Sequence, residues 1–494
     1  MRNRTMKRTS LLSLLLVAAL LSSSCVVGPN YERPKVNAPT EYREAPAAAQ
    51  PASFADLPWW EVFQDETLKG LVRTALANNY DLRIAVTRIE QARQLSAQAR
   101  AQYYPTVDYS AGGGGGRNEY LGNGTNNFDR TQWSWQAAAS AAWEIDLWGR
   151  IRRLNEASQA YYFATEEARR GVLLSLVSDV GQAYFELLGL QLQLDIARRT
   201  TDSFNDTLKL FTQRLEGGVA SKLDTSRAAA ARASAAASIP ELERQIALKE
   251  NQICVLLGQN PGPIQTSARL LDQTFPPEIP AGLPSALLER RPDVREAEER
   301  VRYANARVGL AQAAFFPRVG LTALFGQQSK PVDLLSTGSI TVWSLAGNVA
   351  GPLYRGGELK AQKRQAIAAW EEAKLQYEQT ALLAFQDVAN ALVSRQKYEA
   401  VRVEQMKAVE AYDEAVKVSL KRYIAGFASY YEVLEAQQQL FPAENSLAQT
   451  ELNRRVVVIQ LYKALGGGWN LQDPTWSEAA PPTGAPAPPP ETKK

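Results

Sequence analysis

The sequence of 494 residues contains no histidine, three methionines and two cysteines. Without histidine, catalysis by an imidazole base and metal sites built from histidine are excluded. Of Met1, Met6 and Met406, only Met406 lies beyond the amino-terminal leader, so metal capture by several methionines is excluded too. Serine, threonine and aspartate are plentiful, but they have no imidazole base to activate a nucleophile. We therefore expect a protein that is not an enzyme and that uses no cofactor and no metal.

The chain has no excess of positive charge once its first 24 residues are set aside. Those residues hold four of the 55 basic residues and none of the 52 acidic ones, which leaves 51 basic against 52 acidic residues. Nucleic-acid binding needs a basic surface, and this composition provides no global one. We therefore expect no nucleic acid among the partners.

The amino terminus has the features of an export signal. Four basic residues precede an apolar run of eleven residues, which is too short to span a bilayer as a helix. The run ends in three serines and Cys25, an arrangement similar to a bacterial lipobox. Residues 1–24 are therefore predicted to be a signal peptide, and Cys25 is predicted to carry lipid. Val26 follows instead of aspartate, which by resemblance to sorted lipoproteins indicates the outer membrane. The other cysteine, Cys254, lies in an apolar stretch and is expected to be a buried thiol.

Long stretches without proline predict the main helices. From Ile151 to Glu216 there is no proline, and between Leu173 and Leu215 thirteen positions, twelve of them apolar or alanine, recur at alternating steps of three and four. This heptad pattern predicts a coiled-coil helix, which at about 1.5 Å per residue would be on the order of 100 Å long. A second proline-free stretch, 358–425, predicts a second long helix. Taken alone, such a pattern is typical of a dimeric coiled-coil tether.

The segment before the first long helix changes from a helical period to a period of two. A helical pattern from Asp65 to Tyr104 ends at Pro105. Apolar and polar residues then alternate, and the glycine run 112–116 with the Asn/Gly-rich stretch behind it predicts the turn of a hairpin. The run is not a phosphate-binding loop, because Arg117 stands where a dinucleotide fingerprint needs its last glycine and no Gly-Lys-Ser or Gly-Lys-Thr follows.

The returning strand indicates contact with lipid. From Trp133 to Leu147 one face carries tryptophan, alanine and aliphatic residues, and the other is mostly polar. The interval from Trp133 to Trp143 corresponds to ~33 Å of strand, or ~23 Å across a membrane at a tilt of about 45°, close to the apolar band between two aromatic girdles. Open strand edges are not tolerated in hydrocarbon, so these strands must pair with others from this chain and from further copies.

The sequence resembles itself after a shift of about 210 residues. Tyr104-Pro105 reappears as Phe316-Pro317, and Leu257-Gly258 reappears as Leu465-Gly466. We interpret this as an internal duplication, in which each half contains a helix, a hairpin and a long helical hairpin. The expected organisation is a signal peptide (1–24), a lipid-anchored extended leader (25–64), a first repeat (65–257) with a β-hairpin at 105–148, a connector (258–284), a second repeat (285–469) with a β-hairpin at 317–354, and a disordered Pro-rich tail (470–494).

Several short groups of residues occur in the order found in one family. They are Gly28-Pro29-Asn30-Tyr31 after the predicted lipid site, Trp59-Trp60 with Phe63, Ala75-Leu76 with Asn79 and Asp81-Leu82, Pro105 and Pro317 at the strand entries, and the segment from Tyr462 to Trp469. From Cys25 to Trp469 the chain resembles the outer-membrane efflux lipoproteins of the TolC-like family, which serve resistance-nodulation-division pumps. The resemblance implies an α+β membrane protein and a homotrimer. Each subunit would give four strands to one shared transmembrane β-barrel and its helices to a coiled-coil tunnel. The implied partners are a periplasmic adaptor protein, an inner-membrane resistance-nodulation-division pump and the lipid of the outer membrane.

The same resemblance assigns site residues. The tips that would meet the adaptor are Gly218, Val219, Ala220 and Ser221 in the first half and Gly426, Phe427, Ala428 and Ser429 in the second. Tyr431, Glu432 and Glu435 match the constriction segment, and Asp224 and Tyr423 match positions that link the helices of the closed gate. The arginine that is the usual partner is absent, because Ala428 occupies its place.

Three further acidic residues are expected on the polar faces of the strands. Asp108, Glu144 and Asp146 share that face and are predicted to line a water-filled barrel as solvated charges. The sequence leaves two alternatives to an efflux duct: a conduit of a type I protein secretion system, and a structural coiled-coil lipoprotein of the envelope. The second alternative has no use for strands bounded by tryptophan.

Overall fold

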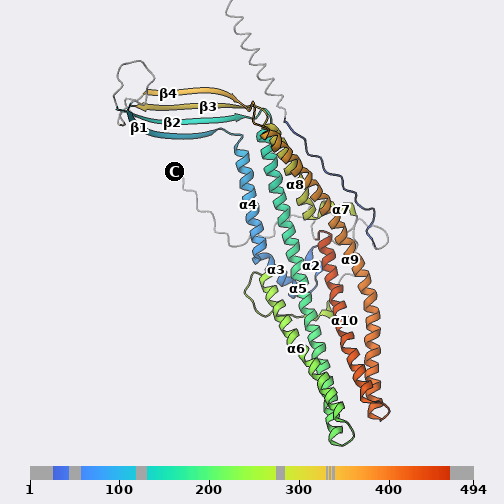
Figure 1. The fold of residues 1–494 in the computed structure, drawn as a ribbon. Helices are drawn as coiled ribbons and strands as arrows, with labels where there is room; N and C mark the ends of the chain where they lie inside the picture. Colours follow the sequence, from blue (N-terminus) through green and yellow to red (C-terminus); the bar gives the residue numbers. More distant parts are fainter. Residues whose placement is uncertain are drawn as a thin grey trace, which may run out of the picture. The chain divides into compact units, whose positions relative to one another are not determined.

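The computed structural model describes residues 26–43, 57–117, 131–273, 284–329, 332, 335 and 340–467. The chain forms two compact units, and each unit combines segments from both halves of the sequence. Figure 1 labels the helices and strands along the chain. The first unit comprises 1–35, 88–166 and 296–377, and the second comprises 36–87, 167–295 and 378–494.

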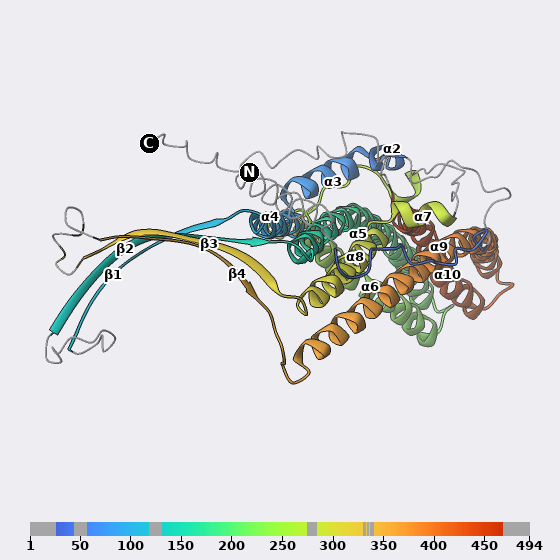
Figure 2. The same cartoon turned by 90° about the horizontal axis from the view of Figure 1, so that it is seen from above.

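The first unit contains a four-stranded antiparallel sheet. Its strands are β1 (Thr106–Arg117), β2 (Thr131–Ile145), β3 (Arg318–Ser329) and β4 (Ile340–Ala350), in the order β1-β2-β3-β4. The two hairpins therefore lie side by side, and the four strands bow together in Figure 2. The hairpin predicted at 317–354 is present, because β4 pairs with β3 over its whole length.

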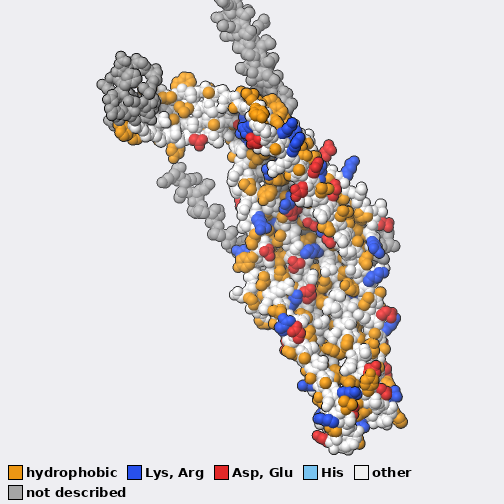
Figure 3. Space-filling view, viewed as in Figure 1, with side chains coloured by type: hydrophobic (Ala, Val, Ile, Leu, Met, Phe, Trp, Pro, Cys, Tyr) orange, Lys and Arg blue, Asp and Glu red, His pale blue; other side chains and the backbone are white. Residues whose placement is uncertain are grey.

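The register gives this sheet one apolar and one mostly polar face. Residues directly opposite each other in an antiparallel pair lie on the same face, and in all three pairs odd-numbered residues oppose odd-numbered ones. The apolar face, made of the odd-numbered strand residues, includes Val107, Tyr109, Trp133, Trp135, Trp143, Leu321, Phe325, Trp343, Leu345 and Val349. The opposite face is small or polar except for Leu324, Ile340 and Val342. In Figure 3 the strands carry mostly orange and white side chains, whereas blue and red side chains are spread over the helices.

The prediction that the glycine run forms a turn is wrong. All five glycines belong to β1 and pair with residues 132–136 of β2. The cause is packing on the apolar face: a Cβ on Gly113 would lie 2.1 Å from the ring of Trp135, and one on Gly115 would lie 2.6 Å from the ring of Trp133. Glycine in β1 thus makes room for two indole rings to lie flat over the neighbouring strand.

The two predicted long helices are present without interruption. They are α5 (Arg150–Glu216) and α9 (Glu358–Ile424), and each passes through both units. Thirteen positions of α5 follow the heptad pattern between Leu173 and Leu215. Ten of them are buried, and Leu190, Leu208 and Leu215 are partly buried. The remaining helices are α2 (Trp59–Val62), α3 (Glu66–Asn78), α4 (Tyr80–Ala101), α6 (Lys222–Leu256), η2 (Leu270–Asp272), α7 (Pro284–Arg290), α8 (Pro292–Ala313) and α10 (Tyr430–Ala464).

The single helix expected from Asp65 to Tyr104 is divided at Asn79 into α3 and α4. The buried Asn79 side chain accepts from the amide of Leu82 (3.0 Å) and donates to the carbonyl oxygen of Leu256 (3.0 Å). Such local capping competes with helix continuation, which the helical period alone does not reveal. The second half divides in the same way at Arg291, between α7 and α8, where Arg291 Nη1 donates to the carbonyl oxygen of Ala464 (3.2 Å).

The free thiol of Cys254 is buried, as expected from its apolar surroundings. It lies near the end of α6, and its sulfur donates to the carbonyl oxygen of Gly262 at 3.3 Å. Cys25, the predicted lipid site, lies outside the described residues.

Candidate functional site

The two helical hairpins of the second unit end in tips of the same construction. At the first tip, the amide of Val219 donates to the carbonyl of Arg214 (2.8 Å), and at the second the amide of Phe427 donates to the carbonyl of Arg422 (2.8 Å). Bonds of this kind, from an amide to the carbonyl five residues earlier, end a helix in the Schellman motif, in which the residue before the donor adopts a positive φ. Gly218 (φ 75°) and Gly426 (φ 80°) occupy that position, and a Cβ there would meet nothing within 4 Å. Both glycines are thus required by backbone conformation and not by lack of space.

In each predicted tip segment the residue after the glycine exposes an apolar side chain. Val219 is 68% exposed and Phe427 is 79% exposed, while the alanine after each of them packs inward. The start of α6 is fixed by a capping box: Asp224 Oδ2 accepts from the hydroxyl of Ser221 (2.7 Å) and from its amide (3.2 Å). Ser429, at the equivalent place before α10, makes no side-chain capping bond.

A cluster of aromatic side chains joins the two hairpins just behind the tips. Phe211 of α5 is fully buried, with its ring centroid 4.1 Å from that of Tyr430 and 5.0 Å from that of Tyr423. The guanidinium of Arg214 lies over the Tyr423 ring, 4.7 Å from its centroid. Burial raises the pKa of Tyr430 to about 12, and the carboxylate of Asp224 adds to this rise. Burial also raises the pKa of Tyr423, so both phenols are neutral at physiological pH.

The predicted constriction residues lie on the first turns of α10. Tyr431 is 60% exposed and Glu435 is exposed, so both side chains are available to solvent. Glu432 forms an ion pair with Arg422 of α9 (Oε2 to Nη1, 3.3 Å), and both side chains are about half exposed. Tyr423, in contrast, is held inside the aromatic cluster. The structure thus places the five predicted gate residues in one tip region.

Sequence reasoning missed the residues that hold this region together. Phe211, Tyr430 and Arg422 were not among the predicted site residues. Phe211 is one of the thirteen heptad positions, and Arg422 with Gly426 repeats Arg214 with Gly218 after a shift of 208 residues, so both signals were present in the sequence. Neither signal states that the two hairpins meet through these side chains.

The three predicted lumen carboxylates have different surroundings. Asp108 is exposed on the polar face of β1. Glu144 is ion-paired with Arg150, whose Nε and Nη2 donate to its two oxygens at 2.7 and 3.0 Å. Asp146 lies just beyond β2, and its oxygens accept from the amides of Ile151 and Arg152, both at 3.0 Å. Asp146 therefore caps the start of α5, and the expectation that it is a solvated strand residue is wrong.

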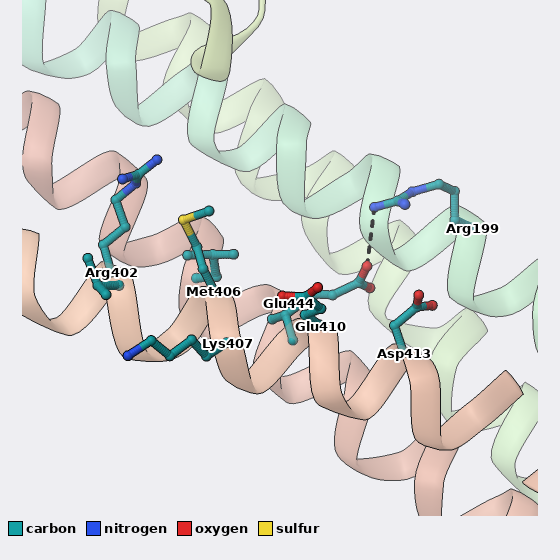
Figure 4. Close-up of a pocket in the computed structure, with 10 residues that line it drawn as sticks. Arg199, Arg402, Met406, Lys407, Glu410, Asp413 and Glu444 are labelled. Atoms are coloured by element: carbon teal, nitrogen blue, oxygen red, sulfur yellow. Dashed lines mark ion pairs between the residues drawn. The ribbon is translucent and has the colours of Figure 1, made fainter. Parts of the chain in front are cut away.

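A groove of about 720 Å³ lies between α5, α9 and α10 (Figure 4). Its lining mixes the apolar side chains of Val403, Met406, Val409 and Leu447 with charged residues. Across it, Arg199 of α5 reaches Glu444 of α10 (3.6 Å), and burial raises the pKa of this glutamate. The groove brings together ion pairs and aliphatic side chains and no nucleophile with a base, so its lining gives no basis for catalysis.

Comparison with known proteins identifies the family. The model of the family described as outer membrane efflux protein matches residues 71–259 and 283–467. The chain belongs to this family. It is 34% identical over 471 residues to the probable efflux pump outer membrane protein TtgC of Pseudomonas putida, covering 94% of this chain and 96% of the relative. It is also 31% identical over 466 residues to the probable outer membrane lipoprotein SilC of Salmonella typhimurium, covering 93% of this chain and 99% of the relative.

The fold of the chain is that of TolC-like outer-membrane channels, an α+β fold with long helices and a small antiparallel sheet. The solved structure of the outer-membrane channel OprN matches with a TM-score of 0.84 and 32% identity, over 90% of this chain and all of that one. As a member of this outer membrane efflux protein family, the chain is a component of efflux machinery in the outer membrane.

Proposed function

We propose that the chain forms the passive exit duct of a tripartite efflux pump and assembles as a homotrimer in the bacterial outer membrane. The two-faced sheet carries this proposal. An apolar face rich in tryptophan suits hydrocarbon, and a mostly polar opposite face suits a water-filled lumen. The same strands in a water-soluble protein would leave large apolar side chains such as Trp343 and Leu345, each more than 70% exposed, in contact with water.

Assembly of several copies follows from the edges of the sheet. β1 and β4 are its outermost strands, and each pairs with one neighbour only. A membrane-spanning sheet with open edges would leave backbone donors and acceptors unpaired in lipid, at a cost of several kcal/mol each. β1 and β4 run in opposite directions, so β4 of one copy can pair in antiparallel fashion with β1 of the next. Three copies sharing one barrel close the ring.

The partners are assigned to the tips and to the amino terminus. The exposed side chains of Val219 and Phe427 give two apolar contacts for the hairpin of a periplasmic adaptor, through which an inner-membrane resistance-nodulation-division pump engages the duct. Acylation of Cys25 anchors the chain in the outer membrane, and the relative SilC, described as a lipoprotein, supports this. The energy for export comes from the inner-membrane pump.

The gate is assigned to the start of α10. In a trimer, three copies of Glu432 and Glu435 converge on the channel axis, where like charges concentrate cations and resist crowding. The usual arginine is replaced by Ala428, and Arg422 instead forms the ion pair with Glu432 within one subunit. Together with the aromatic cluster, this pair holds the closed state until the adaptor binds.

The experiment is a conductance measurement on the trimer in planar bilayers. Glu432→Ala combined with Glu435→Ala should raise the closed-state conductance and weaken block by divalent cations, because the charge ring is removed. The matched control is Glu241→Ala combined with Glu243→Ala, which removes two exposed carboxylates from α6 away from the tip. Single-channel currents and divalent block that stay at the wild-type level in the first pair would refute the gate.

A further inference from the structure

The segment just after the predicted lipid site is held by a buried arginine of α5. The side chain of Arg153 is 3% exposed. Its Nε donates to the carbonyl oxygen of Val27 (3.2 Å), and its Nη2 donates to the carbonyl oxygen of Gly28 (3.1 Å) and to Oδ1 of Asn30 (3.1 Å). The amide of Val27 donates to the carbonyl oxygen of Trp148 (3.2 Å). Displacing the leader would break all three hydrogen bonds that this charged side chain donates to it, and hydrogen bonds from a charged donor are the stronger kind.

The same segment is bonded to α8, which comes from the other half of the chain. The fully buried Asn305 donates its Nδ2 to the carbonyl oxygen of Pro29 (3.1 Å). Glu298 accepts from the hydroxyl of Tyr31 at Oε1 (3.0 Å) and from Arg33 at Oε2 (2.9 Å). The leader therefore binds helices of both halves within the first unit.

Glycines allow the backbone to approach this closely. Gly28 has a φ of 98°, and a Cβ on it would lie 2.4 Å from the Cα of Gly309. A Cβ on Gly309 would lie 2.7 Å from Nε of Arg153, and one on Gly149 would lie 2.9 Å from Cγ1 of Val26. Such distances are impossible between unaltered atoms. A side chain at Gly28 or Gly149 would therefore push the leader away from the helices, and one at Gly309 would displace the Arg153 side chain that binds the leader.

We propose that these contacts of residues 26–33 with α5 and α8, the leader clasp, fix the lipid-modified amino terminus beside the end of the sheet. Val27 is bonded to Trp148, three residues after β2 ends, and two residues of chain reach at most about 7 Å beyond it. The acyl chains then enter the membrane next to the apolar face, in the leaflet where that end of the strands lies. The binding partner of the amino terminus held by the leader clasp is therefore the lipid of that leaflet. The inference rests on the proposed acylation of Cys25.

A lipid anchor held by the leader clasp keeps the sheet close to the membrane surface, which a lipid anchor on a flexible tether does not. An anchor on a flexible tether keeps the protein at the membrane but leaves the sheet free to sample many distances from it, which lowers the effective concentration of the strands at the lipid surface. A terminus held within a few residues of β2 keeps the sheet at the surface it must enter. The leader clasp should therefore speed insertion and trimer formation beyond what lipid attachment alone provides.

The test compares the full-length protein with two variants and one control in cells. Arg153→Ala removes the donor, and Gly28→Ala blocks the close approach to α8 without changing either helix. Arg198→Ala removes an arginine from an exposed ion pair with Glu243 on the same long helix and serves as the control. The formation of SDS-resistant, heat-modifiable trimers is followed by pulse labelling. We expect both variants to form trimers on the order of tenfold more slowly than the wild type and the control, because each disrupts the leader clasp. A factor of about ten corresponds to the loss of only one of the three charge-assisted hydrogen bonds that Arg153 donates to the leader.

Two further measurements separate the possible outcomes. A spin label on Glu32→Cys, in a Cys254→Ala background, should be immobile in the wild type and mobile in both variants. An immobile label in both variants, or trimers that form at the control rate, would overturn the inference. Palmitate labelling tests the proposed anchor separately: wild-type protein without palmitate would overturn the acylation and the inference with it, whereas palmitate labelling with unchanged assembly would overturn the inference alone.

Discussion

Truncation of Phe211 should loosen the tips of the helical hairpins. Its side chain is fully buried, with ring centroids of Tyr430 and Tyr423 at 4.1 and 5.0 Å. Phe→Ala in a packed core costs about 3–5 kcal/mol, of which the aromatic contacts are a part. Because the cluster joins the two hairpins near their ends, this cost should fall mainly on local opening of the tips. The lower value corresponds to a rise of about two orders of magnitude in the population of opened tips.

Amide hydrogen exchange measures that opening directly. In Phe211→Ala, amides of the tips and of the first turns of α6 and α10 should exchange about 100-fold faster, while those of the sheet should be unchanged. Phe427→Ala provides the matched control, because that side chain is 79% exposed and its loss leaves the cluster intact. In planar bilayers, only Phe211→Ala should raise the closed-state conductance. Equal exchange at the tips in the two variants would refute the role of the cluster in closing the duct.

Three other predictions address the sheet, the helical core and the anchor. Gly113→Val should displace an indole ring and reduce the yield of heat-modifiable trimers, whereas Gly112→Val, where a Cβ meets nothing within 4 Å, should be tolerated. Burial raises the pKa of Glu451, but hydrogen bonds from two arginines outweigh it and leave the pKa below its usual 4.5. This carboxylate therefore stabilises the fold above that pH, so Glu451→Gln should lower the melting temperature at pH 7, and the difference should shrink as the pH falls below 4.5. Cys25→Ser should abolish palmitate labelling and still allow the barrel to insert.

Much of the fold can be predicted from the spacing of apolar residues along the sequence and from the places where that spacing changes. The heptad pattern and the absence of proline predict the uninterrupted helix α5, and the alternation bounded by Trp133 and Trp143 predicts the apolar face of β2. In both cases a single face is buried or meets lipid, so local sequence records it. The tether interpretation of the heptads accounts for α5, but it offers no reason for the apolar face of the sheet.

The errors arise where distant residues decide the local structure. The glycine run is strand because indole rings on β2 occupy the space that side chains of β1 would need. Asp146 is a local exception: it accepts from amides only five and six residues further on, where the alternation of the strand has already ended. The leader clasp joins Arg153 to Val27, which is 126 positions away. Turn propensity and alternation are local signals, and they carry no information about contacts of this range.

The most direct test of the account is the environment of successive residues of β2 in the membrane. Spin labels placed singly at residues 137–142, in a Cys254→Ala background, are compared for their accessibility to oxygen, which dissolves in lipid, and to a water-soluble nickel complex. Labels at odd positions should respond to oxygen and labels at even positions to nickel, because the two faces of the sheet meet lipid and lumen. Access to nickel at all six positions would contradict a lipid-facing sheet and, with it, the duct.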